Sequence, residues 1–172
     1  QLRFLSTAWK NDPRVLTVIL TSCHSLEQLN LRNVILNQEM ISSICYQNGQ
    51  TLKVLKLDHY CKIEWIQLII DNCLELSVLD LSTACLSKES IEYVTKNVTP
   101  KISKLWLTGI KSEKKCQQMI EKLKDRCSNL TEIKMSQSRG IFGTTYGIRS
   151  QSSNQKEKDD LRVMISTFRS YE

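Results

Sequence analysis

The chain has 172 residues, of which 41% are hydrophobic and 24% are charged, and it carries a formal net charge of +6. This length and composition predict one globular domain with a sizeable core. The lysines and arginines form no block with interleaved aromatic residues, and no apolar run approaches the roughly 18 residues of a membrane span, so we expect neither a nucleic-acid nor a membrane partner.

One phrase, L-x-x-L-x-L, recurs along the chain. A weak copy at Leu2 precedes five clearer copies, which begin at Leu26, Leu52, Leu76, Ile102 and Leu130. Successive clear copies therefore start 24 to 28 residues apart. A fixed period in the twenties with this apolar core is typical of leucine-rich repeats. The chain also opens inside a repeat, so we expect it to be a piece of a longer protein.

Each repeat is expected to contain one short strand and one helix. The strands are predicted over residues 26–32, 52–58, 76–82, 102–108 and 130–136. The helices are predicted over residues 12–22, 38–47, 63–72, 88–97 and 113–126. Four polar residues precede helices as expected N-caps, namely Asp12, Asn37, Ser87 and Ser112.

Neither element of such a unit can bury its apolar face alone, so neighbouring units must stack. We therefore expect an α/β fold, a leucine-rich-repeat solenoid over residues 1–135. It would curve like a horseshoe, with parallel strands on the concave side and the wider helices on the convex side.

The repeat pattern stops after Met135. Residues 136–154 are rich in Ser, Gly and Gln and predict a flexible loop. Residues 155–172 are expected to form a C-terminal capping helix or tail, because apolar residues return at helical spacing, at Leu161, Met164, Ile165 and Phe168. The alternative is that this tail folds across the concave face.

The seven cysteines follow the repeat. Cys23, Cys73 and Cys127 each lie three residues before a copy of the phrase, and Cys61 and Cys85 each lie four residues after one. This phase predicts buried, unbridged thiols that pack the core, and hence a reducing compartment, either cytoplasm or nucleus. The chain has no C-x-x-C pair, and its two histidines have no ligand-spaced partners, so we expect no metal and no cofactor.

Residues 23–31 and 73–85 resemble the cysteine-containing leucine-rich repeats of F-box proteins, in which C-x-x-L-x-x-L-x-L is followed by another cysteine. Residues 99–107 look like a repeat of the S-phase kinase-associated branch of that family. The resemblance implies a non-catalytic subunit that recognises the protein substrate of an SCF-type ubiquitin ligase. It also implies linker and cullin subunits as partners, bound through an F-box that this chain lacks and that we expect upstream of Gln1.

No catalytic constellation stands out. Cys61 near His59 could form a thiol–imidazole pair, but Cys61 has the phase of a core residue and the pair lacks a third orienting group. Function is therefore expected in side chains that point outward from the strands. The predicted protein-binding residues of the concave face are Asn30, Arg32, Lys56, Asp58, Asp80, Lys104, Trp106 and Lys134.

Trp106 is the aromatic member of that set, and either a partner or the C-terminal tail is expected to cover it. A second hypothesis for the whole chain is a structural or assembly factor built on the same repeat, for example one associated with a mitochondrial complex. An enzyme is the third hypothesis and has the least support.

Overall fold

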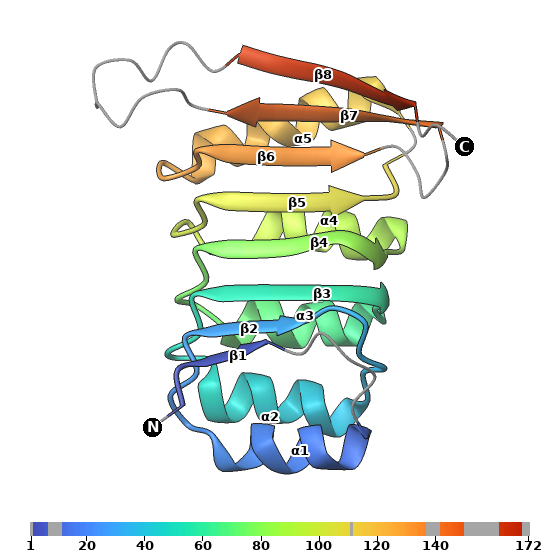
Figure 1. Ribbon diagram of the computed structural model, residues 1–172. Coiled ribbons are helices and arrows are strands. Elements are labelled where there is room, and N and C mark those ends of the chain that lie inside the picture. The colour runs from blue at the N-terminus through green and yellow to red at the C-terminus, as the bar shows by residue number, and fades with distance from the viewer. Residues whose placement is uncertain (1, 7–11, 111, 137–141, 150–161, 170–172) are drawn as a thin grey trace.

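A computed structural model describes residues 2–6, 12–110, 112–136, 142–149 and 162–169 of the protein. These residues form one sheet of eight strands, and the helices lie together on one of its faces (Figure 1). The elements in chain order are β1 (Phe4–Ser6), α1 (Pro13–Ser22), β2 (Gln28–Leu31), α2 (Gln38–Asn48), β3 (Val54–Tyr60), α3 (Ile63–Asn72), β4 (Val78–Cys85), α4 (Lys88–Asn97), β5 (Lys104–Thr108), α5 (Glu113–Arg126), β6 (Glu132–Ser136), β7 (Phe142–Arg149) and β8 (Arg162–Arg169).

The order of strands in the sheet is their order in the chain. Strands β1 to β6 pair in parallel, each with the next, and a helix connects each neighbouring pair. The predicted α/β architecture with strands alternating with helices is therefore confirmed. Every strand and helix predicted up to residue 136 is present, with boundaries that shift by a few residues.

The leucines of the recurring phrase form the core between sheet and helices. In the phrase that begins at Leu26, all three leucines have at most 1% of their surface exposed, and the same holds for the phrases at Leu52, Leu76 and Ile102. In the last phrase Ile133 and Met135 are equally buried, whereas Leu130 is only partly buried. The second and third apolar positions of each phrase are two residues apart in a strand. They are buried together because alternate side chains of a strand point to the same face of the sheet.

The predicted N-caps hold in three of four cases. The side chain of Asp12 accepts a hydrogen bond from the amide of Arg14, that of Asn37 from Met40, and that of Ser87 from Ser90. Ser112 also occupies the N-cap position of α5, but its side chain accepts no capping hydrogen bond. The helix begins where expected, but the predicted capping hydrogen bond of Ser112 is not formed.

All seven cysteines are free thiols. Five are buried, and Cys23 and Cys85 are half-buried. The thiols of Cys45 on α2 and Cys73 after α3 are neighbours, and their hydrogen bond, together with burial, raises the pKa of Cys45. Burial also raises the pKa of the Cys127 thiol. The predicted burial is therefore correct for Cys61, Cys73 and Cys127, and wrong for Cys23 and Cys85, which are only half-buried.

The region after residue 136 differs from its prediction. Strand β7 occupies part of the expected loop, and β8 stands where residues 155–170 were expected to be helical. The two strands are antiparallel to each other, and β7 is antiparallel to β6, so they extend the sheet past β6. The segment Arg162–Arg169 contains Val163, Ile165 and Thr167, whose branched side chains favour strands, and a short apolar run of this kind also fits helical spacing.

The helix expected there is therefore a strand. The rest of the expected loop and tail, residues 137–141, 150–161 and 170–172, lies outside the described residues.

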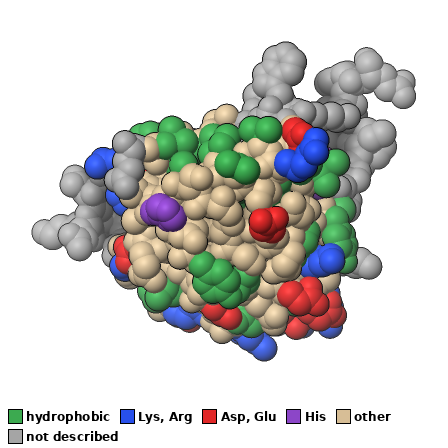
Figure 2. Space-filling model, turned by 90° about the horizontal axis from the view of Figure 1, so that it is seen from below, with side chains coloured by type: hydrophobic (Ala, Val, Ile, Leu, Met, Phe, Trp, Pro, Cys, Tyr) green, Lys and Arg blue, Asp and Glu red, His purple; other side chains and the backbone are tan. Residues whose placement is uncertain are grey.

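The end of the molecule formed by α1 has few charges. Viewed from that end, the surface shows several separate hydrophobic patches among uncharged polar groups, with most charged side chains near the rim (Figure 2). Val15 and Val18 of α1 are among the exposed apolar residues. In the described part of the chain, no helix has both the length and the apolar character that crossing a membrane requires.

Candidate functional site

The face of the sheet that carries no helices, here called the open face, presents one continuous row of side chains. The register places Asn30 beside Lys56, Lys56 beside Asp80, Asp80 beside Trp106, and Trp106 beside Lys134. These five residues come from five different strands. The sequence predicted this alignment, and the pairing of the strands confirms it.

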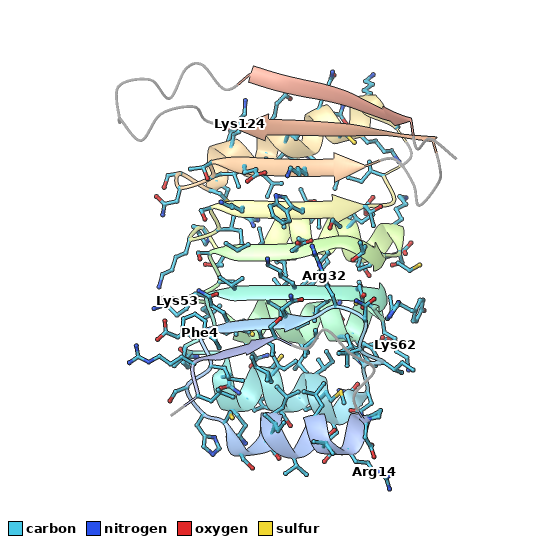
Figure 3. All side chains as sticks on the ribbon, viewed as in Figure 1. Phe4, Arg14, Arg32, Lys53, Lys62 and Lys124 are labelled. Atoms are coloured by element: carbon cyan, nitrogen blue, oxygen red, sulfur yellow. The ribbon has the colours of Figure 1, made fainter. Side chains whose placement is uncertain are left out.

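The side chain of Arg32 extends along this row. Arg32 follows the end of β2, and its guanidinium donates a hydrogen bond to Asp80 Oδ2 on β4, so that it lies over β3 (Figure 3). Asp80 is 0% exposed, and its Oδ1 accepts two further hydrogen bonds, from the amide (3.1 Å) and the hydroxyl (2.7 Å) of Ser82. Asp80 therefore positions Arg32 and offers a partner no surface of its own, which corrects its expected role as a contact residue.

Asp58 also serves the local structure. It is 6% exposed, and its Oδ2 accepts a hydrogen bond from the backbone amide of Asn33, in the turn after β2. Asn33 has a φ of 65°, a left-handed conformation that asparagine tolerates better than most residues. The register of β3 against β4 shifts between Lys56 and Asp58. Asp58 thus stabilises the turn at Asn33. Because only 6% of Asp58 is exposed, it offers a partner little surface.

A cluster of charges surrounds Trp106 at the other end of the row. The Nζ atom of Lys134 lies 4.6 Å from the centre of the indole ring, within the range of a cation–π interaction. Glu132 pairs with Lys134 (2.9 Å) and with Lys104 (3.9 Å). The indole N–H is buried, and no described residue accepts a hydrogen bond from it. The cluster therefore combines two exposed lysines with a half-buried aromatic ring.

Glu132 was not among the predicted site residues. Its outward strand position was visible in the sequence, but its role as the shared anion of two lysines depends on the register of β5 against β6. Lys56, the second residue of the row, forms no ion pair with a described residue. The charges along the described row therefore differ: Asp80 neutralises Arg32 in the middle, and Glu132 pairs with two lysines at the β6 end.

A second group of charged residues lies where the strands begin, and no sequence pattern predicts it. Glu27 pairs with Arg3 (3.4 Å) and with Lys53 (2.9 Å), which lies at that edge of the sheet in Figure 3. The hydrogen bond from Lys53 lowers the pKa of Glu27. Because all three side chains are exposed to water, these ion pairs add little to the stability of the protein.

The two side chains of the possible thiol–imidazole pair each contact Asp58. Cys61 is buried, and its thiol donates a long hydrogen bond of 3.7 Å to the backbone carbonyl of Asp58. His59 is half exposed, and its Nε2 lies 3.5 Å from the carboxylate of Asp58. Within the described part of the chain, no three His, Cys, Asp or Glu side chains gather in a way that could hold a metal ion.

Comparisons of the chain with protein families, with curated proteins and with solved structures found no match.

Proposed function

We propose that residues 1–135 form a leucine-rich-repeat solenoid whose concave side is the open face, and that this face recognises another protein. The observation that carries the proposal is the continuous row from Asn30 to Lys134, in which each strand contributes one residue. Repeat proteins of this kind use extended concave surfaces for binding. The expected contact residues are those with exposed surface: Asn30, Arg32, Lys56, Lys104, Trp106 and Lys134.

The cysteine-phased repeat and its resemblance to F-box proteins support a more specific proposal. The chain would be the substrate-recognition part of an SCF-type ubiquitin ligase and would act in the cytoplasm or nucleus. It would bind its protein substrate on the open face, while an F-box upstream of Gln1 would bind the linker subunit and, through it, the cullin. The chemistry of ubiquitin transfer would belong to other subunits, so this chain would have no catalytic role.

The experiment is affinity purification of the full-length gene product, followed by identification of its stable partners. Stoichiometric recovery of a linker and a cullin subunit, together with an F-box in the upstream coding sequence, would support the ligase proposal. An upstream Arg-rich amphipathic transit segment would instead favour the assembly factor, and recovery without linker or cullin would exclude the ligase.

A matched pair of variants tests the recognition face separately. Lys56→Glu changes a residue of the row on the open face, whereas Lys62→Glu changes an exposed lysine just before α3, outside the row. Substrate recovery should fall for Lys56→Glu and remain at the unmodified level for Lys62→Glu, with linker recovery unchanged in both. Equal substrate recovery from both variants would remove the open face from recognition.

A further inference from the structure

A groove between α4 and α5 lies on the helical face, away from the row described above. Two cavities of about 340 and 300 Å³ open there, and Glu92, Lys115 and Met119 line both of them. Because they share these residues, the two cavities form one elongated depression along the helices.

The floor of the larger cavity is apolar, whereas Thr95 and Gln118 contribute polar groups to the smaller one. Ile91 and Ile110 are each 4% exposed, and the half-buried Leu86 and Met119 complete the floor. Gly109 also lines this part of the groove, beside Leu86 and Ile91. An apolar floor of this size offers a ligand burial in a preformed depression.

The rim of the groove is basic. Four lysines line it, Lys88 and Lys96 from α4 and Lys115 and Lys122 from α5, against the single acid Glu92. Glu92 lies 3.8 Å from Lys88, and the other three lysines have no ion-pair partner among the described residues. The groove therefore carries three uncompensated positive charges around its apolar floor.

The spacing of the lysines gives the groove its direction. Lys96 lies eight residues after Lys88, and Lys122 lies seven residues after Lys115. At 1.5 Å per helical residue, each pair is separated by about 10–12 Å along its helix. Carboxylates two turns apart on a bound helix have the same separation, because i and i+7 lie on one face.

We propose that this groove binds an acidic amphipathic helix of a partner protein, with its apolar face on the floor and its carboxylates against the lysines at both ends. Helix-in-groove recognition of this type uses apolar anchors at i, i+3, i+4 and i+7. A fatty acid carries one carboxylate and would leave the lysines at one end unused. A lipid surface is broad and would not enter a depression between two helices.

The test is a selection of peptides about 15 residues long, roughly 22 Å as a helix, from a random display library against the whole chain. We expect enrichment of peptides with apolar residues at helical spacing and acidic residues two turns apart. Enriched peptides are then measured by fluorescence anisotropy, and their affinity should fall as salt rises, because screening weakens rim charges. Enrichment of basic or uncharged peptides, or of none, would overturn the proposal.

Matched variants locate the binding. The double variant Lys115→Glu and Lys122→Glu should weaken the enriched peptides by about tenfold or more, since two attractive contacts become repulsive. Lys114→Glu makes the same kind of charge change at an exposed position of α5 that lines neither cavity, and it should leave affinity unchanged. If both variants weaken peptide affinity equally, or if the double variant does not weaken it, the peptides do not bind in the groove.

Anionic phosphatidylserine vesicles are the competing probe. Co-sedimentation with these vesicles that requires Lys115 and Lys122, and that an enriched peptide fails to displace, would assign the groove to lipid and overturn the proposal. A peptide that displaces the protein from vesicles, or an absence of sedimentation, agrees with it.

Discussion

The guanidinium of Arg32, just after β2, hydrogen-bonds to the carboxylate of Asp80 on β4, and β2 and β4 are not neighbours in the sheet. The side chain spans β3 to do so. Asp80 is fully buried, whereas the side chain of Arg32 keeps 36% of its surface exposed. Asp80 is therefore part of the interior, whereas Arg32 is accessible on the open face.

Replacing Asp80 should destabilise the protein more than its single ion pair suggests. Asp80→Ala removes the partner of Arg32 and of both donor groups of Ser82, and we expect it to lower the free energy of unfolding by about 2–4 kcal/mol. Urea unfolding of Asp80→Ala, Arg32→Ala and the double variant gives the coupling energy, which should be about 1–2 kcal/mol.

The exposed pair Glu75 and Lys101 is the control for that cycle, because it joins two repeats through one side-chain hydrogen bond but has both partners at the surface. Its coupling energy should lie between about 0 and 1 kcal/mol, as is usual where both partners meet water. Equal coupling energies for the two pairs would show that burial of Asp80 does not strengthen its bond.

Trp106 should matter more for recognition than for folding. Because Trp106 lies on the open face and is only partly buried, Trp106→Ala should lower the free energy of unfolding by only about 1–2 kcal/mol, including the loss of the cation–π contact with Lys134. Affinity for the partner recovered with the full-length protein should fall by about 2 kcal/mol or more by calorimetry.

Leu79→Ala provides the comparison within the core, where a buried leucine leaves a cavity that costs about 2–5 kcal/mol. If Trp106→Ala proves as destabilising as Leu79→Ala, the ring belongs to the core and not to the recognition face.

Gly49 should not tolerate a side chain. Gly49 is the C-cap of α2, a position where glycine usually adopts a positive φ, yet its φ is −56°, which any residue adopts. The reason for glycine is instead a close approach between repeats, since a Cβ atom would lie 2.6 Å from the backbone oxygen of Asn72. Gly49→Ala should therefore cost about 2–4 kcal/mol by urea unfolding, because backbone has to move.

Gly109→Ala is the counterpart, since the new Cβ would meet only ordinary contacts but φ is +89°. Its cost should be about 1–2 kcal/mol, through backbone strain alone. A smaller loss for Gly49→Ala than for Gly109→Ala would contradict the crowding at Gly49.

The core thiols should resist alkylation. Iodoacetamide reacts with thiolates, so at about pH 8 the half-buried Cys23 and Cys85 should be labelled well before Cys45 and Cys127, whose pKa values are raised. Mass spectrometry of native and urea-unfolded protein measures the order. Rapid labelling of Cys45 in the native protein would contradict its burial.

The same thiols give stability a dependence on alkaline pH. Unfolded cysteines ionise near pH 9, while the raised pKa values keep Cys45 and Cys127 protonated in the folded protein. The unfolded state then releases protons that the native state retains, so this contribution is fully present below about pH 9 and is lost as pH rises further. Serine at both positions should flatten that decline, measured as the urea midpoint against pH.

The period of the leucines predicted which residues align from strand to strand. It did not predict side-chain contacts between repeats that are not adjacent. The spacing of the leucines was sufficient to place Lys56 and Trp106 in one row, because side chains in equal phase align when strands pair in parallel. It could not show that Arg32 reaches past β3, since that contact joins residues 48 positions apart through a long side chain. Asp80 was consequently expected to be available to a partner, although it is buried.

The C-terminal strands were missed for a different reason. The apolar residues of Arg162–Arg169 suit a helix and a strand alike, and the strand forms because it pairs with the edge of β7. The groove between α4 and α5 was equally hidden, because no period marks where two helices separate.

The order of strands in the sheet has a mechanical consequence. Each strand is hydrogen-bonded only to its neighbours in the chain, so tension applied to the N-terminus should peel β1 and α1 away first while the rest stays folded. The next event would differ, because β2 is fastened through Arg32 to β4 as well as to β3. In a single-molecule pulling trace β2, β3 and β4 should give way in one larger step, and Arg32→Ala should divide that step into smaller ones.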